Sequence, residues 1–256
     1  MSHTATRSSV VDPGIARSIA LLAYSLVAYF IGVAGLGLLI LATVGLVPLG
    51  LFQVAGGSLA HAAIDVGLLL LFGVQHSVMA RPAFKRRLTR VVPVAMERST
   101  FVWTSGVALG AAVLLWQSVD GVIWHATGML SWVLLGVGVF GWAYLLAATF
   151  AIDHWDLFGL RQAWLAARGQ DYTDVAFKEQ WMYRYSRHPI MLGVLIGIWS
   201  LPTMTATQCF LSGGLTLYIV IGVYFEERDL IRQWGKSYLD YKRKIGALFS
   251  IPGRSK

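Results

Sequence analysis

The chain has 256 residues, of which 56% are hydrophobic and only 13% are charged, and its mean hydropathy is +0.62. Soluble globular proteins carry about 25% charged residues, so this composition excludes an ordinary soluble domain and predicts a bundle of membrane-spanning helices. The net charge of +8 does not predict a nucleic-acid partner, because Lys and Arg follow the pattern of membrane topology.

Apolar runs long enough to cross the hydrocarbon core, which takes about 20 residues, recur along the chain. The first four expected spans are residues 18–46, 60–80, 99–118 and 127–152. Residues 189–225 then contain no charged side chain, and they predict a helical hairpin turned around residues 201–207. Its first arm is short and its second is full length. We therefore predict an all-α bundle with five to six membrane segments.

The positions of Lys and Arg predict the orientation of this bundle. All 21 lie in four regions: the N-terminal segment, residues 81–98, residues 153–188 and the tail from residue 228. These regions alternate with connections that contain none, and cytoplasmic loops are the ones enriched in Lys and Arg. Both termini are therefore expected to be cytoplasmic.

The ends of the chain differ from the spans, although we expect residues 1–256 to form a single domain. Residues 1–14 are polar and expected to be mobile. In the tail, residues 233–246 have apolar and aromatic side chains at helical spacing. They predict either an amphipathic helix on the membrane surface or a solvated helix that caps the bundle.

Ionisable groups at membrane depth are costly and point to function by default. Asp65 follows His61 by four residues, a spacing that lets the two pair on one helix face, and we expect a structural role for them. His76 lies near the end of the same span and is either a packing histidine or a functional one. Ser99 or Thr100 is expected to cap the start of the next helix.

The segment after the fourth span, "FAIDHWDLFGLRQAW", mixes acidic, basic and aromatic residues. His154 stands between Asp153 and Asp156, and Arg161 follows. A carboxylate can orient an imidazole and raise its basicity, so this group is a workable general base. The alternative is an interfacial helix with ordinary caps and ion pairs.

Two charged stretches, "RYSRHPIMLG" and "YFEERDLIRQWG", open and close the predicted hairpin. A tight hairpin brings them to one membrane face, where adjacent glutamates are costly unless they are paired or bind a cation. Pro189 would begin the first arm with backbone groups left free for a ligand, and Gly193 would permit close approach to the helix. The cluster expected to form comprises Arg187, His188, Glu226, Glu227 and Arg228.

These residues resemble the motif of the membrane methyltransferases related to isoprenylcysteine carboxyl methyltransferase. Members of that family carry Arg-His-Pro-x-x-x-Gly, a hydrophobic hairpin and then a Glu-Glu pair, although many have tyrosine where this chain has Met191. The resemblance implies that S-adenosyl-L-methionine binds on the cytosolic side, with no metal. The cofactor-binding residues it implies are Tyr185, Arg187, His188, Pro189, Leu192, Gly193, Glu226, Glu227 and Arg228.

The stretches "QHSVMARPAFK", "ERSTFV" and "IDHWDLFGLRQ" look like the bacterial methanethiol S-methyltransferase branch of this family. That resemblance implies an enzyme of the inner membrane that methylates a small volatile thiol to dimethyl sulfide. The candidate base is His154 with Asp153 or Asp156, and His76 is the second candidate. Arg161, Arg81 or Arg98 would stabilise the anion. The alternatives are a lipid, prenylcysteine or other thiol acceptor, or a non-catalytic haem or quinone subunit.

Overall fold

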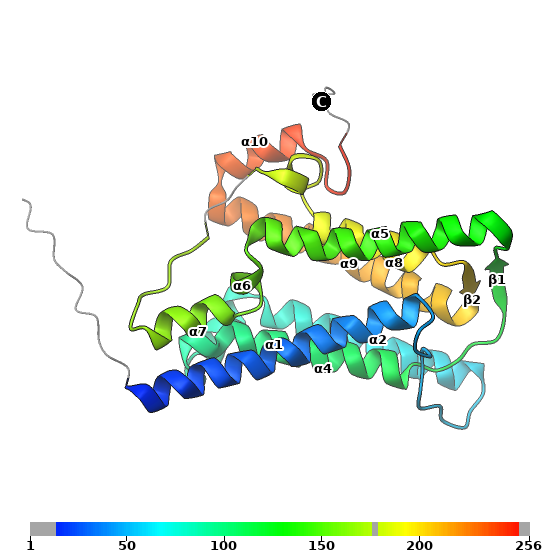
Figure 1. Ribbon diagram of the computed structural model, residues 1–256, viewed down its shortest axis with the longest axis horizontal. Helices are drawn as coiled ribbons and strands as arrows, with labels where there is room; N and C mark the ends of the chain where they lie inside the picture. Colours follow the sequence, from blue (N-terminus) through cyan, green and yellow to red (C-terminus); the bar gives the residue numbers. More distant parts are fainter. Residues whose placement is uncertain (1–13, 176–178, 251–256) are drawn as a thin grey trace, which may run out of the picture.

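The structure of the protein is a computed structural model that describes residues 14–175 and 179–250. Within these ranges five helices are long and apolar enough to cross a membrane, and they run along the long axis of the molecule (Figure 1). They are α1 (Ile15–Thr43), α2 (Ser58–Met79), α4 (Val94–Leu115), α5 (Gly128–Ile152) and α9 (Ala206–Trp234). The predicted all-α membrane bundle is confirmed. Residues 1–13, expected to be mobile, lie outside the described ranges.

The predicted hairpin is present as a short helix followed by a long one. Helix α8 (Pro189–Trp199) has 11 residues, whereas α9 has 29. Helix α9 begins at a capping box in which Thr205 and Gln208 bond each other's backbone. It continues past Phe225 to Trp234, so both glutamates of the motif lie on the helix. The tail then forms α10 (Lys236–Lys244), within the predicted amphipathic stretch.

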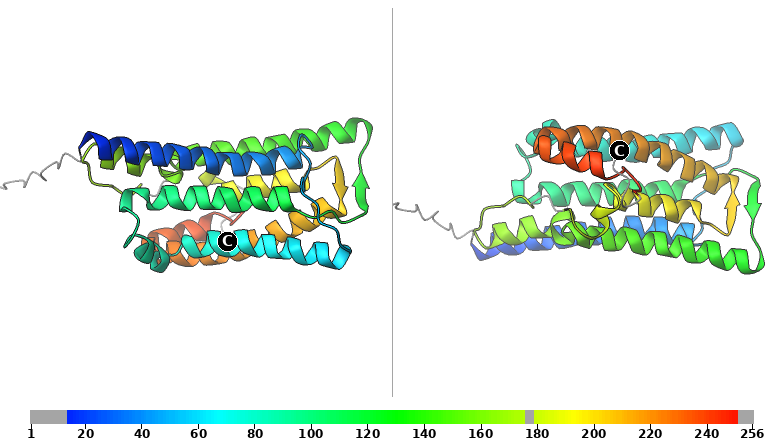
Figure 2. Two further views of the ribbon diagram at one scale, coloured as in Figure 1. Left: turned by 90° about the horizontal axis from the view of Figure 1, so that it is seen from below. Right: turned by 90° about the horizontal axis from the view of Figure 1, so that it is seen from above.

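The two ends of the bundle are built differently. At one end β1 (Val122–His125) pairs antiparallel with β2 (Thr203–Thr205), a small sheet that the sequence analysis did not anticipate. The short helices gather away from that sheet (Figures 1 and 2). They are α3 (Pro82–Leu88), α6 (His154–Leu157), α7 (Leu160–Ala167) and the 3₁₀ helix η1 (Trp181–Arg184).

The end with the short helices also carries the basic segments of the described chain, as their predicted alternation requires. Residues 81–98, 153–175, 179–188 and 228–250 lie there, whereas the connections at the sheet end contain no Lys or Arg. We call this the basic end of the bundle. Its location in the cytoplasm remains a prediction.

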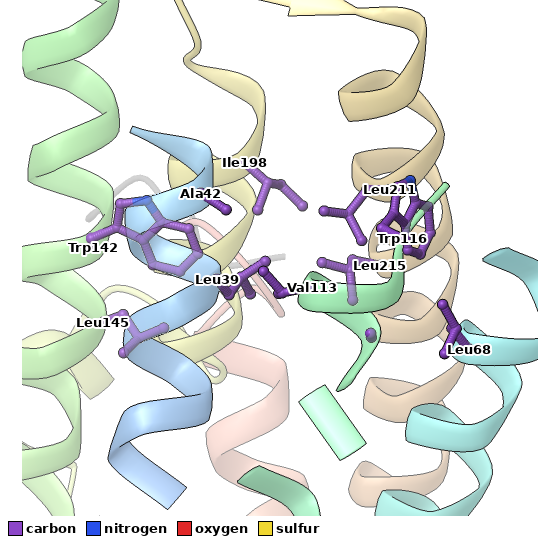
Figure 3. Packing of buried hydrophobic residues seen from close by; sticks show 11 residues of the cluster. Leu39, Ala42, Leu68, Val113, Trp116, Trp142, Leu145, Ile198, Leu211 and Leu215 are labelled. Atoms are coloured by element: carbon purple, nitrogen blue, oxygen red, sulfur yellow. The ribbon is translucent and has the colours of Figure 1, made fainter. Parts of the chain in front are cut away.

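The buried core lies between α1, α2, α4, α5, α8 and α9 and includes Trp116, Trp142 and Ile198 (Figure 3). By contrast, the outer faces of the long helices carry large apolar side chains that are more than half exposed, among them Val27, Phe30, Leu70, Phe140 and Leu217. Such a band would be unfavourable in water and is favourable against lipid tails. The protein is an integral membrane protein.

Helices α5 and α8 approach each other at a glycine of the predicted motif. A Cβ atom at Gly193 would lie 2.7 Å from both the Gly141 carbonyl oxygen and the Leu145 backbone nitrogen. Small residues permit this kind of close approach between helices in membranes. Gly193 therefore permits the close packing of α5 on α8, and its contact with a cofactor remains a prediction.

Asp65 and His61 make structural contacts, as expected, but they do not pair with each other. Asp65 is buried and accepts a hydrogen bond from the Gln117 backbone over 2.7 Å, which fixes the chain just after α4, and His61 bonds backbone carbonyls. The helix cap expected at Ser99 or Thr100 is wrong. Helix α4 begins at Val94, so Ser99 and Thr100 lie inside it. Their hydroxyls donate to Ser25 Oγ and to the carbonyl oxygen of Met96, so neither caps the helix start.

Candidate active site

The N-terminus of α8 meets the last turns of α9, as predicted. Nδ1 of His188 lies 3.4 Å from Glu226 Oε2, and its Nε2 lies 3.3 Å from Glu227 Oε1. Arg187 Nε donates to the same Glu227 oxygen over 2.7 Å. Neighbouring side chains diverge by about 100° around a helix, so the two carboxylates face different surroundings while the imidazole bridges them.

Glu227 is the buried member of the pair, and cations surround it. It accepts from Arg187, and from Lys242 Nζ over 2.5 Å. Arg187 also donates to the carbonyl oxygens of Lys242 and Ile245, and its backbone nitrogen donates to Gly246 over 3.1 Å. These contacts join α8, α9 and the chain after α10. Glu227 therefore holds the frame of the site, since its oxygens are already engaged.

Glu226 differs, because its side chain is 46% exposed and contacts only His188 among the described ion pairs. Its charge also acts on His76 of α2, on Arg98 of α4 and on Tyr183 of η1. One half-exposed carboxylate thus stands at the junction of several elements. It is the member of the pair with oxygen atoms available to a ligand.

The other motif residues occupy the edge of this cluster. Pro189 begins α8, and the Leu192 backbone nitrogen donates to the His188 carbonyl oxygen. Tyr185 is half exposed, and its carbonyl oxygen accepts from Ser250. The expected meeting of Arg228 with this cluster is wrong: its guanidinium lies over the Tyr224 ring, 5.7 Å from the centroid. Arg228 follows Glu227 by one position, so its side chain points away from the face of α9 that meets α8.

Three tyrosines border the cluster and were not anticipated from the sequence. Burial, reinforced by Glu227, raises the pKa of Tyr238 to about 12. Burial also raises the pKa of Tyr183, with Glu226 adding to the effect. Tyr241 donates its hydroxyl to the Tyr183 carbonyl oxygen over 2.6 Å. The phenols stay protonated at neutral pH. The amphipathic spacing of the tail could have identified Tyr238 and Tyr241, which share a helix face with Lys242.

His154 is buried, and hydroxyl groups rather than carboxylates hold it. Its Nδ1 lies 2.8 Å from Thr149 Oγ1, and its Nε2 lies 3.1 Å from the Tyr29 hydroxyl. Its ring stacks on Phe150 with 4.1 Å between centroids. Burial lowers the pKa of His154, against the opposing effect of Asp153. The expected hydrogen bond between this histidine and a neighbouring carboxylate is wrong.

The two neighbouring carboxylates have structural contacts of their own. Asp153 caps α6 by accepting from the Asp156 backbone over 3.0 Å. Asp156 accepts from Arg161 over 2.9 Å and from the Tyr172 hydroxyl over 3.3 Å. The ion pair raises the pKa of Arg161. This arrangement matches the alternative of an interfacial segment with ordinary caps and pairs.

A cavity of about 720 Å³ opens beside the same segment. Its walls include Asp156, Arg17 of α1, and Glu97 and Arg98 of α4. Two buried oxygens of wall residues, Glu97 Oε1 and Gln162 Oε1, have no hydrogen-bond partner among the described residues. The predicted acceptor segment thus lines a large cavity of mixed charge.

His76 is on α2 and faces α4 and α9. Its Nδ1 is 3.1 Å from Ser105 Oγ. The rings of Phe72, Phe101 and Tyr218 surround it at centroid distances of 5.4, 4.7 and 6.2 Å. His76 is therefore fixed on one edge by a hydroxyl and on its sides by aromatic rings.

Known proteins with similar sequences share most of the chain. A methanethiol S-methyltransferase of Mycobacterium tuberculosis is 45% identical over 75% of this chain and 80% of its own length. Methanethiol S-methyltransferase 2 of Bradyrhizobium diazoefficiens is 44% identical over 73% of each chain. The Pseudomonas deceptionensis methanethiol S-methyltransferase is 39% identical over 96% of this chain and 95% of its own.

The chain belongs to the methanethiol S-methyltransferase family. No family model and no solved structure matches it. Membership makes the protein a transferase, and the five apolar helices make this methyltransferase a membrane enzyme. Methyl transfer needs a site for a methyl donor and a site for an acceptor.

Proposed function

We propose that this protein transfers the methyl group of S-adenosyl-L-methionine to methanethiol, giving dimethyl sulfide by in-line displacement. The observation that carries the proposal is the contrast within the Glu-Glu pair. Glu227 is buried among three cationic or imidazole side chains, whereas Glu226 is half exposed and contacts His188 alone among the described ion pairs. A carboxylate left open beside a membrane segment favours a cationic ligand.

The residues at this position fit S-adenosyl-L-methionine, which supplies an electrophilic methyl group on a sulfonium cation when bound. The Glu226 carboxylate would attract the cation, and His188 would hold that carboxylate in place. Tyr185 and Leu192 border the same cluster. Arg187 and Glu227 would act by fixing the positions of His188 and Glu226, because their own hydrogen bonds are filled within the protein.

The site lies at the basic end, which we assign to the cytoplasm because cytoplasmic loops are enriched in Lys and Arg. A charged donor reaches that face from the cytosol, and a small apolar thiol partitions into the lipid. An active site at the boundary is accessible to both. Holding both reactants near attack distance supplies much of the rate enhancement in such a transfer.

We extend the proposal to domain organisation and location. Residues 1–256 would form one domain whose part from residue 150 to 256 holds the cofactor and the catalytic groups. The relatives named above are bacterial, and we assign the protein to the inner membrane.

The experiment uses purified protein in lipid nanodiscs with radiolabelled S-adenosyl-L-methionine. We expect methyl transfer to methanethiol and little transfer to prenylcysteine or phospholipid. Glu226→Gln should weaken donor binding by at least about tenfold, since it removes a charge–charge interaction. Asp240→Asn is the matched control, because it removes a carboxylate from the surface of α10 whose ion pair among the described residues is with Arg243.

Donor binding to Glu226→Gln equal to that of the wild type would refute the cofactor site. Preferred transfer to a lipid or to prenylcysteine would refute the acceptor. A visible haem absorption band in the purified protein would favour the haem-subunit alternative.

A further inference from the structure

A thiol acceptor needs a base, because the thiolate is the effective nucleophile and a simple alkanethiol is a weaker acid than cysteine. Resting on the proposed function, we propose that His76 takes the proton from the acceptor thiol. The acceptor would lie between α2, α4 and α9, about one helical turn deeper in the bundle than Glu226.

His154 is unsuited to this role because both of its ring nitrogens are engaged. Thr149 donates its hydroxyl proton to the Leu146 carbonyl oxygen over 2.7 Å. Its oxygen must therefore accept from His154 Nδ1–H. The Nε2 atom of His154 then has the lone pair that accepts from the Tyr29 hydroxyl. No nitrogen of this imidazole remains to receive a proton without breaking a buried hydrogen bond.

His76 has the opposite arrangement. Ser105 contacts Nδ1. By contrast, Nε2 has no hydrogen-bond partner among the described residues, and it is not one of the fully buried polar atoms that lack a partner there. The Phe101 and Phe72 rings keep the imidazole in place without using its nitrogens. The histidine therefore keeps one nitrogen without a hydrogen bond among the described residues, and its neighbours hold the ring in position.

The packing of α2 on α9 shows where His76 lies relative to Glu226 of the proposed cofactor site. Gly73 lies against the ring of Tyr218, and Arg81 pairs with Asp229 over 2.5 Å. The two helices therefore run in the same direction, and His76 lies between these two contacts. Glu226 is near the second contact, about one turn closer to the basic end.

Charges of both signs lie around His76. Arg98 of α4 and Glu226 of α9 both act on it, and Tyr218 is the other titratable group that faces it from α9. Among the described residues no carboxylate lies within ion-pair distance of Arg98, whose Nε donates to the Leu157 carbonyl oxygen. Arg98 would favour the thiolate but oppose the imidazolium, whereas Glu226 would favour the imidazolium.

The large cavity near Asp156 is a poorer acceptor site. Cavities of several hundred Å³ accommodate drug-sized ligands, whereas methanethiol has two heavy atoms and leaves 720 Å³ mostly filled with water. Water would compete for the methyl group and solvate the thiolate. His76 does not lie on the walls of that cavity, and three aromatic rings surround it.

The methyl transfer to a thiol requires one proton acceptor. The donor supplies the methyl carbon and leaves as a neutral thioether, so the acceptor sulfur uses a lone pair for the new bond and gives up only its proton. Nε2 of His76 takes that proton. The imidazolium then returns it to water, and the product sulfide leaves uncharged.

The test compares His76→Gln with the wild type for two acceptors, methanethiol and thiophenol, which is largely ionised at neutral pH. We expect kcat for methanethiol to fall by about 10²–10⁴-fold, with donor affinity unchanged and little loss for thiophenol. In a second readout without donor, the ultraviolet thiolate band of bound alkanethiol should appear with wild-type protein and be absent with His76→Gln.

His154→Gln is the matched control, and it should keep the wild-type ratio of the two acceptor rates. Ser105→Ala provides a second variant should His76→Gln fail to fold, and it should show a smaller loss confined to methanethiol. Equal losses for both acceptors, or an unchanged methanethiol rate, would overturn the role of His76. Donor binding distinguishes that failure from failure of the proposed function, which predicts loss of binding in Glu226→Gln.

Discussion

His188 and His154 stand in similar sequence surroundings, each in a polar segment beside an apolar helix, yet their environments differ. His188 touches two carboxylates that lie nearly 40 residues downstream. His154 touches two hydroxyls and neither of the aspartates that flank it in the sequence. One histidine belongs to a charged cluster, and the other belongs to a neutral aromatic one.

The two histidines differ because of where the neighbouring carboxylates find their partners. Asp153 bonds the first turn of α6 because a short helix needs its cap, and Asp156 bonds Arg161, a half-buried arginine within reach. Glu226 and Glu227 reach His188 because the hairpin of α8 and α9 returns them to its start. Contact in this protein follows helix packing rather than closeness in sequence.

The largest loss of stability is expected from Glu227→Gln. The change leaves Arg187 without its buried partner and weakens the hold on Lys242, and breaking a buried pair costs about 3–5 kcal/mol. Thermal unfolding in nanodiscs should show a large decrease in the midpoint. Glu226→Gln, at the half-exposed neighbour, should change the free energy of unfolding by less than about 1 kcal/mol. Equal losses in the two variants would contradict the division of roles within the pair.

A smaller effect is expected at Gly193, which shares the motif with His188 but faces α5. In Gly193→Ala the new methyl group would meet backbone atoms of Gly141 and Leu145 at 2.7 Å. Overpacking of this kind costs about 1–3 kcal/mol. Unfolding should therefore occur at a lower temperature, and donor affinity measured well below that temperature should be kept.

Gly222→Ala is the matched control for this substitution. It places the same methyl group on α9, where nothing lies within 4 Å. A weakened donor affinity in folded Gly193→Ala would show instead that this glycine faces the cofactor.

The sequence was sufficient for the bundle because the apolar runs are long and the charged residues sit between them. The hairpin and its glutamates followed from the same pattern. The sheet of β1 and β2 was missed because three or four residues leave no periodicity to read. The start of α4 was placed too late because Ser99 and Thr100 are typical caps, yet here their hydroxyls bond α1 and the preceding turn.

Side-chain partners were the least predictable part of the site. Nothing in the sequence near His154 indicates Tyr29, which comes from α1, and nothing near Glu227 indicates Lys242 of α10. Such contacts depend on how helices far apart in the chain pack together. The tail could have supplied Lys242 and its tyrosines, since its spacing placed them on one helix face.

The smallest expected effect is the contribution of His154 to the pH dependence of stability. Burial lowers the pKa of His154 in the folded protein below its ordinary value near 6.5. Between these two values the unfolded chain binds more protons than the folded one, so stability falls as pH decreases through that window and is fully present above it. Replacing His154 with glutamine should flatten this acid-side loss of unfolding temperature. His125→Gln, at an exposed histidine of β1, should leave the slope as it is in the wild type. An unchanged slope in His154→Gln would mean that this imidazole accepts a proton in the folded state without cost, and the neutral cluster assigned to it would then be wrong.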